Sequence, residues 1–162
     1  NDLNKALLAI KKGLSKNEKS ERGYFLLGNV QIMLKNYKSA LNAFKKSSKF
    51  NSNFWQSINN EGLVLFELNN TEKAISKFKY AHKISKNAEP MLALAIALYS
   101  SENNHIKSIA LAKNALKSNP KYVSSKYQKE QLWGKKLRNA AEVLFKSKEM
   151  IKAVKEAKEK NK

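Results

Sequence analysis

The chain contains 162 residues, with 32 Lys and Arg, 13 Asp and Glu, two His and no Cys, which gives a net charge of +19. The lack of cysteine excludes disulfides, thiolate metal sites and cysteine nucleophiles, and two histidines are too few for an all-histidine metal site. A hydrophobic content of 42% is enough for a folded core. We therefore expect one folded domain with no cofactor and no bound metal.

The longest apolar run covers residues 91–99, which is too short to cross a membrane, and no signal-peptide pattern opens the chain. The first residue is Asn rather than Met, so we expect the N-terminus to be truncated. A soluble protein is expected, and both a cytoplasmic and an exported location stay open.

The positive charge consists almost entirely of lysine, because only Arg22 and Arg138 are arginines. Specific recognition of phosphates or bases relies on arginine, whose planar group forms paired hydrogen bonds. The basic residues concentrate at the two ends: residues 1–54 hold 11 basic and three acidic residues, and residues 123–162 hold 12 and five. Two interpretations stay open, a solvated lysine-rich surface and a module that binds polyanions such as nucleic acid or an anionic membrane surface. Acidic residues interleaved with the C-terminal lysines favour the first.

Glycine and proline are scarce, and apolar residues recur every three or four positions. This spacing is typical of amphipathic helices and argues against a turn-rich β fold. Short breaks rich in Asn, a good helix-capping residue, separate the helical stretches. In chain order these breaks lie at residues 35–36, 51–53, 69–70, 103–104 and 119–120.

Similar residues also recur at a constant step of 34 positions, as Gly28 and Gly62 do, and Phe44 and Phe78. Other columns with this step are Ala6, Ala40, Ala74 and Ser108; Leu7, Leu41, Ile75 and Ile109; and Ser47, Ala81 and Ala115. Two antiparallel helices that cross closely need small residues at the crossing, and a bulky residue then fills the gap to the next hairpin. The step predicts a stack of helical hairpins.

This period and its residues resemble the tetratricopeptide repeat (TPR) family. The signature positions hold Tyr24, Leu27, Gly28, Tyr37, Ala40 and Phe44 in one repeat; Gly62, Leu65, Ala74, Phe78 and Ala81 in the next; and Leu92, Tyr99, Ala112, Ala115 and Pro120 in the third. The resemblance implies an all-α fold, a right-handed superhelical solenoid of antiparallel helical hairpins.

The repeats divide the chain, as a single TPR domain over residues 1–162, into six parts. These are a partial repeat helix (1–20), three full repeats (21–54, 55–88 and 89–122), an inserted helical extension (123–133), and a degenerate repeat with a C-terminal cap (134–162). The insert either lengthens the first helix of the last hairpin or forms a separate short helix before it. Glu61 departs from the family pattern, which prefers Leu there, and so does Ile96, where Gly or Ala is preferred.

In this family the first helix of each hairpin lines a concave face that holds a peptide or helix of a partner protein. The resemblance implies the same here, with one set of residues from each full repeat. The set is Phe25, Asn29, Ile32 and Met33; Gln56, Asn59, Asn60, Leu63 and Phe66; and Ala93, Ala97 and Ser100. Asn can bond to a peptide backbone, while Phe and Met offer apolar contact area. The alternative for Phe25, Leu63 and Phe66 is packing between hairpins.

No catalytic motif is present, and neither His82 nor His105 has a carboxylate or second histidine at ligand spacing. We expect a non-enzymatic scaffold or assembly factor that binds a protein partner, with no small-molecule substrate; self-association through the solenoid ends stays open. The lysine-rich, polyanion-binding module is the alternative. Trp133, in the inserted segment, either anchors that segment against the third repeat or contacts a partner.

Overall fold

A computed structural model describes residues 2–101 and 105–161 of the chain. Within these ranges all regular structure is helical, with no strand, which confirms the all-α prediction. The helices are α1 (Asp2–Lys16), α2 (Glu21–Met33), α3 (Tyr37–Phe50), α4 (Trp55–Glu67), α5 (Thr71–Ser85), α6 (Ala88–Ser100), α7 (His105–Ser118), α8 (Ser125–Glu130), α9 (Lys135–Phe145) and α10 (Ile151–Glu159), with short 3-10 helices η1 (Pro120–Val123) and η2 (Lys148–Met150).

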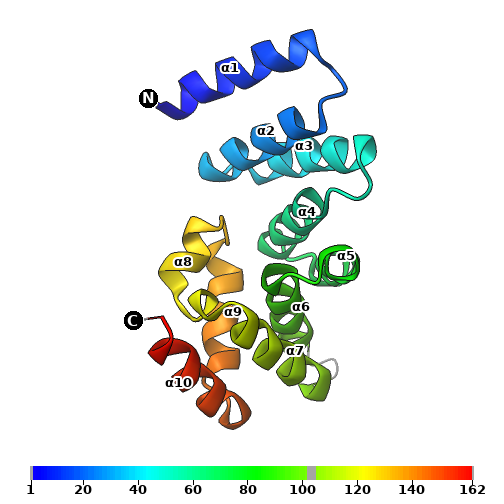
Figure 1. Ribbon diagram of the computed structural model, residues 1–162. Coiled ribbons are helices and arrows are strands. Elements are labelled where there is room, and N and C mark those ends of the chain that lie inside the picture. Colours follow the sequence, from blue (N-terminus) through cyan, green and yellow to red (C-terminus); the bar gives the residue numbers. More distant parts are fainter. Residues whose placement is uncertain (1, 102–104, 162) are drawn as a thin grey trace.

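Six consecutive helices form three antiparallel hairpins, in which α2 packs on α3, α4 on α5, and α6 on α7. The hairpins stack through α3 against α4 and α5 against α6, while α1 packs on α2 at one end. Figure 1 shows the resulting elongated, curved arrangement, in which each hairpin stacks on its neighbours. This is the predicted solenoid of antiparallel hairpins.

The two glycines 34 positions apart mark close helix crossings. A Cβ atom on Gly28 would lie inside van der Waals contact of the Phe44 ring, and one on Gly62 would meet the Phe78 ring in the same way. Both phenylalanines are fully buried. The missing side chain of each glycine leaves the room that the phenylalanine ring of the paired helix occupies. The 34-residue step in the sequence therefore corresponds to the same helix crossing in successive hairpins.

The first helix of a hairpin ends in the same way in two successive repeats. Lys35 and Asn69 have left-handed φ values of 61° and 62°. In each case the next amide closes the helix: the N–H of Asn36 donates to the carbonyl of Gln31, and that of Asn70 donates to the carbonyl of Leu65, both at 2.8 Å. This hydrogen bond satisfies a carbonyl that the helix end would otherwise leave free. The third break, at residues 103–104, lies outside the described residues.

The core is unevenly distributed along the solenoid. A large cluster of buried residues runs from Leu63 in α4 to Ala157 in α10, whereas a smaller one is centred on Phe44. Helix α1 contains no buried residue at all. The second half of the molecule is therefore packed more completely than the first.

The chain reverses its path after α7. Residues 123–133 include the end of η1 and the separate short helix α8, the second of the two alternatives left open for this insert. Helix α9 then packs on α6 and α4, and α10 returns to α7 and η1. Helix α9 thus lies on the inner side of the hairpins, along the first helices of two repeats, whereas α10 packs against the end of the third hairpin.

Candidate interaction groove

The inner sides of α2, α4 and α6, the first helices of the three hairpins, form the surface that we call the groove. The predicted groove residues of α2 differ in exposure: Phe25 and Asn29 are half-buried, Ile32 is buried, and Met33 is 54% exposed. The Phe25 ring lies 5.0 Å from that of Phe54 and 6.1 Å from that of Phe44, so it takes part in packing between hairpins while one side stays accessible.

The predicted residues of α4 are mostly covered. Gln56 is half-buried, whereas Asn59, Asn60, Leu63 and Phe66 are buried. The Nδ2 of Asn60 donates to the Oδ1 of Asn29 at 3.0 Å, which joins the first two repeats across the groove. This hydrogen bond therefore uses part of the capacity of both asparagine side chains to bond to a partner.

The predicted residues of α6 divide sharply. Ala93 and Ala97 are fully buried, and Ser100 is exposed. The Ser100 hydroxyl donates to the carbonyl of Ile96 at 2.9 Å, one turn earlier in the same helix. The small residues of α6 allow another helix to approach closely rather than leaving a hollow.

That helix is α9, and the carboxylate of Glu67, at the end of α4, holds its first turn. The N–H of Leu137 donates to Oε1 of Glu67 at 3.0 Å, and the N–H of Lys136 donates to Oε2 at 3.2 Å. The Lys136 side chain donates in turn to the carbonyl of Glu67 at 2.8 Å and to Oδ1 of Asn69 at 2.7 Å. A carboxylate at a helix N-terminus satisfies free amides and interacts favourably with the helix dipole.

Trp133 anchors the segment before α9. The side chain is 2% exposed, and its Nε1 donates to Oε1 of Glu89 in α6 at 3.2 Å. Its ring lies 5.5 Å from that of Tyr122. Of the two interpretations left open for Trp133, the structure places it in the anchoring position against the third repeat.

Leu132 extends these contacts to the first repeat. It packs against the small cluster of Ile32, Ala40, Phe44 and Val64, and it has a left-handed φ of 65°. A left-handed conformation costs free energy for a residue that has a Cβ atom. Here it ends α8, and the N–H of Trp133 donates to the carbonyl of Gln128 at 3.0 Å. Residues 132–137, which we call the docking segment, therefore contact parts of all three full repeats.

Glu61, the residue that departs from the family pattern, is fully buried and ion-paired. Its Oε2 lies 2.7 Å from Nζ of Lys77, and its Oε1 accepts from the hydroxyl of Ser48 at 2.5 Å. The carboxylate thus links α4 to both α3 and α5. A buried charge is tolerated when it is paired in this way.

Glu89 is a half-buried residue whose carboxyl lies inward, with no ion pair in the described structure. Burial of the carboxyl raises its pKa to about 7, although hydrogen bonding from Trp133, Tyr122 and Asn59 opposes this shift. Burial and the adjacent Glu89 also raise the pKa of Tyr122. Asn59 is fully buried, and apart from its approach to the Glu89 carboxyl its side-chain amide has no hydrogen-bond partner in the described structure. This polar cluster lies where α4, α6 and η1 meet.

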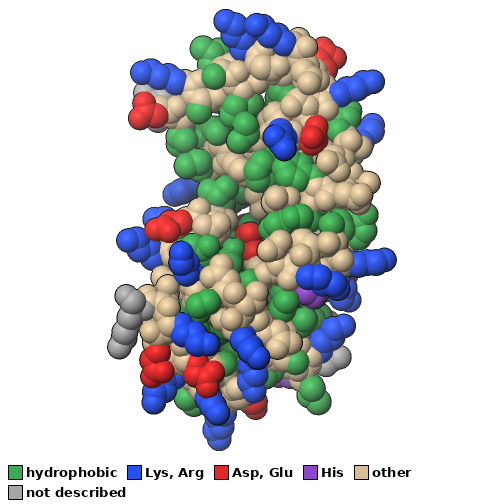
Figure 2. Space-filling view, viewed as in Figure 1, with side chains coloured by type: hydrophobic (Ala, Val, Ile, Leu, Met, Phe, Trp, Pro, Cys, Tyr) green, Lys and Arg blue, Asp and Glu red, His purple; other side chains and the backbone are tan. Residues whose placement is uncertain are grey.

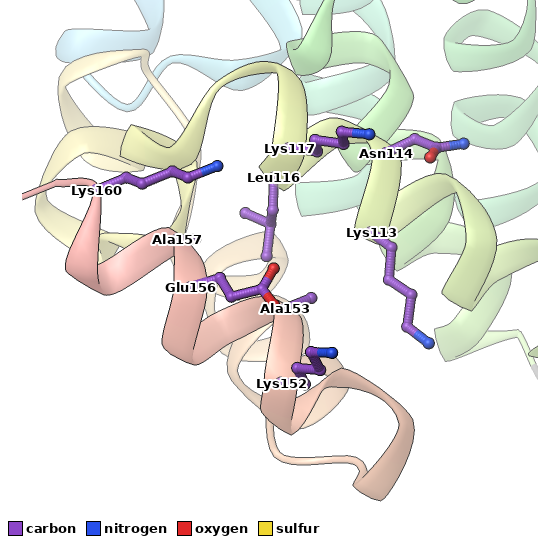
Figure 3. Close-up of a pocket in the computed structure, with 9 residues that line it drawn as sticks. All are labelled: Lys113, Asn114, Leu116, Lys117, Lys152, Ala153, Glu156, Ala157 and Lys160. Atoms are coloured by element: carbon purple, nitrogen blue, oxygen red, sulfur yellow. The ribbon is translucent and has the colours of Figure 1, made fainter.

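A second concave feature lies at the C-terminal end, between α7 and α10. Lys113 and Lys117 of α7 and Lys152 and Lys160 of α10 border a cleft of about 370 Å³, with Glu156 between the two helices (Figure 3). Its floor contains Leu116, Ala153 and Ala157. Such an arrangement attracts anions, while the central carboxylate weakens that attraction.

Side-chain types are distributed unevenly over the face shown in Figure 2. Hydrophobic side chains gather across its upper and middle parts, over the first hairpin and α4, while lysines and arginines project from the outline and from the C-terminal end. Among residues 2–101 and 105–161, no helix is long and apolar enough to span a membrane. The same residues contain no group of three or more potential His, Cys, Asp or Glu metal ligands.

No protein-family model matches the sequence, and no curated protein is significantly similar to it. Solved structures, however, share its fold. The alignment with a crystal structure of MamA has 21% sequence identity, covers 99% of this chain and 91% of the MamA chain, and gives a TM-score of 0.72. YrrB, described as a TPR protein with an unusual peptide-binding site, is 18% identical, covers 98% and 84%, and has a TM-score of 0.66.

A third structure, TTC0263, is a thermophilic TPR protein from Thermus thermophilus. It is 21% identical, covers 80% of this chain and 72% of its own, and has a TM-score of 0.65. The resemblance read from the 34-residue step is therefore confirmed at the level of the fold, which is that of TPR proteins.

Proposed function

From the TPR fold, we propose that this chain is a non-enzymatic interaction scaffold or assembly factor that holds a peptide or helix of a partner protein in the groove. One observation supports this most strongly. The inner sides of α4 and α6 already hold a helix, α9 of the same chain, through a capping carboxylate and a buried aromatic anchor. YrrB, with the same fold, is described as having a peptide-binding site.

We assign the contacts with the partner to the groove residues that keep accessible surface: Phe25, Asn29, Met33, Gln56 and Ser100. The buried members of the predicted set support these positions from below and fix their spacing. They are Ile32, Asn59, Asn60, Leu63, Phe66, Ala93 and Ala97. Stacked hairpins hold such a surface in one conformation before binding, which lowers the entropy lost on capture.

Site-specific photo-crosslinking tests the proposal. A benzophenone amino acid replaces Met33 in the groove or, as the matched control, Tyr80 on α5; these side chains are 54% and 45% exposed. Crosslinked proteins are recovered from extracts of the source cells and identified. We expect a defined product from position 33 only, and its yield falls severalfold in Asn29→Ala and Gln56→Ala backgrounds.

Equal products from both positions, or a yield insensitive to both substitutions, would contradict groove capture. A product that consists of two copies of this chain identifies self-association, and sedimentation at increasing concentration checks that result.

The lysine cleft between α7 and α10 favours a second candidate function, the binding of a polyanion such as nucleic acid or an anionic membrane surface. Its support is that four lysines, Lys113, Lys117, Lys152 and Lys160, border one concavity. For a polyanion bound through lysines, the logarithm of the binding constant falls linearly with the logarithm of the salt concentration. A mobility-shift and liposome assay across salt concentrations, with Lys113→Gln/Lys117→Gln as the variant, tests it; affinity that the variant leaves unchanged rules out this cleft.

A further inference from the structure

A cavity of about 370 Å³ opens beside the docking segment, where the N-terminal ends of α4 and α6 approach η1 and the end of α8. Its walls include Trp55, Asn87, Glu89, Asn119, Tyr122 and Gln131. This volume falls within the range of roughly 300–1,000 Å³ that is typical of small-ligand sites.

The charge of this cavity is opposite to that of the molecule. Among the described residues that line it, Glu89 alone can be charged near neutral pH, and none is a lysine, arginine or histidine. The nearest basic residues in the sequence, Lys86 and Lys121, are exposed and lie outside the wall. In a chain with 32 basic and 13 acidic residues, such a lining is exceptional.

The carboxyl group of Glu89 is held in place without an ion pair among the described residues. Trp133 donates to Oε1 at 3.2 Å, and no ion pair involves Glu89 among the residues that the structure describes. Burial without a cation raises the pKa of this carboxyl to about 7. A buried carboxyl that lacks a cation binds one favourably, because the pairing offsets its loss of hydration.

The remaining wall suits one kind of cation. The half-buried Trp55 contributes an indole to the wall, and the side-chain oxygens of Asn87 and Gln131 are acceptors. The ring of Tyr122, which packs against Trp133 and Tyr127, closes the wall beside them. A guanidinium group is planar, stacks on aromatic rings and carries five donors, whereas an ammonium group is a strongly hydrated point charge. Several separated acceptors beside aromatic rings therefore favour arginine.

We propose that this cavity binds an arginine side chain, with Glu89 as the pairing carboxylate and Trp55 as the stacking partner. The inference rests on the proposed function in one respect, since the arginine is supplied by the captured polypeptide. It makes the cavity the specificity pocket of the groove: Glu89 pairs with the guanidinium, and the accessible residues of α2 contact the flanking chain.

A small probe tests the cavity independently of any partner. Nα-acetyl-arginine amide is titrated into the full chain at physiological salt, and the indole N–H signals of Trp55 and Trp133 are followed by NMR. The expected result is a saturable shift with a dissociation constant of about 1–10 mM, the range of a single well-placed contact. Nα-acetyl-citrulline amide, which has the same shape without the charge, should cause no saturable shift, and Nα-acetyl-lysine amide should bind severalfold more weakly than the arginine probe.

Glu89→Gln is the decisive variant, because glutamine keeps an acceptor for Trp133 and removes the charge. It should weaken binding of the arginine probe at least tenfold. Glu130→Gln, which removes an equal charge from an exposed position on α8, should leave it within twofold. An unchanged affinity in Glu89→Gln, equal binding of citrulline, or equal binding of lysine overturns the assignment.

The outcome is separable from that of the proposed function. If the probe does not bind while position 33 still crosslinks to its partner, the cavity is not an arginine site and groove capture stands. If the probe binds as expected while position 33 gives no specific product, groove capture fails and the cavity remains an arginine site.

Discussion

The two ends of the groove differ in how completely they are covered. Around α4 and α6 the docking segment and α9 lie on the inner surface, and one continuous core joins α4 to α10. Around α1 and α2 the described structure shows less cover: Leu132 contacts the cluster that contains Ile32, while Leu8, Leu26 and Met33 are 71%, 51% and 54% exposed. The same repeat therefore gives a filled groove at one end and an open one at the other, and the difference lies in the residues outside the repeats.

Substitution of Trp133, the residue that anchors the filled end of the groove, should have the largest effect on stability. Trp133→Ala removes a buried indole and its hydrogen bond to Glu89, and truncating a buried aromatic residue typically costs about 3–5 kcal/mol. We expect hydrogen exchange to accelerate in α8, α9 and α6 while the amides of α2 and α3 stay protected. A uniform loss of protection over all hairpins would show that the two ends do not differ in this way.

The pH dependence of the filled end follows from Glu89. Its pKa in the folded protein is about 7, above the ordinary value of 4.5. The folded state thus binds this proton more tightly than the unfolded state, so the contribution of Glu89 is fully present below pH 4.5 and is lost as the pH rises through 7. The groups that face the carboxyl, Trp133, Tyr122 and Asn59, carry no charge in this interval.

Urea unfolding at a series of pH values measures this loss, which is at most about 3 kcal/mol for a shift of this size. Glu89→Gln should remove most of the decline between about pH 5 and pH 8. A variant with the same decline as the wild type would place the titration on another group.

The helix crossings should be less sensitive. Gly62→Ala forces a Cβ into the ring of Phe78, and overpacking of this kind costs about 1–3 kcal/mol. Gly13→Ala is the matched control in α1, since nothing lies within 4 Å of its Cβ position, and it should stabilise the helix by about 0.5–1 kcal/mol. Thermal unfolding of both variants tests the pair; the same sign of change in both would contradict the account of the crossings.

The smallest effect concerns the left-handed residues. Lys35 is exposed, so Lys35→Gly relieves backbone strain without losing a contact and should stabilise the protein by about 0.5–1 kcal/mol. Leu132 has the same backbone conformation but packs against the small cluster, so Leu132→Gly should be a net loss. Melting temperatures that rise for both variants would mean that Leu132 contributes little packing.

The sequence predicts the repeats well because their determinants are local. Gly28 with Phe44, and Gly62 with Phe78, lie 16 positions apart within one hairpin, and the 34-residue step repeats the same crossing. The departure at Glu61 is also explained locally, because Lys77 and Ser48 on the adjoining helices satisfy its carboxylate. The 34-residue period and the residue types at its positions are sufficient to predict this part of the fold.

The cover of the groove is not predictable in this way. Glu67 caps a helix that begins almost 70 residues later, and Trp133 reaches Glu89 across 44 positions. The alanine and leucine pattern after Gly134 is compatible with another repeat. The long-range contacts of Leu132, Trp133 and Lys136, together with the burial of Leu137, Ala141 and Leu144 in the common core, place α9 on α4 and α6. Trp133 is the single signal in the sequence, as an isolated tryptophan in a segment outside the repeats.

The central claim is that the C-terminal part folds back over the second and third repeats, reaches the first repeat through Leu132, and leaves Leu26 and Met33 of that repeat exposed. Methyl-labelled NMR tests it directly through nuclear Overhauser contacts between Leu132 and the cluster that contains Ile32 and Val64. The account predicts these contacts together with contacts from the Trp133 indole to α6. The account is contradicted if these contacts are absent and α9 instead contacts α7, which is the arrangement expected of a further stacked repeat.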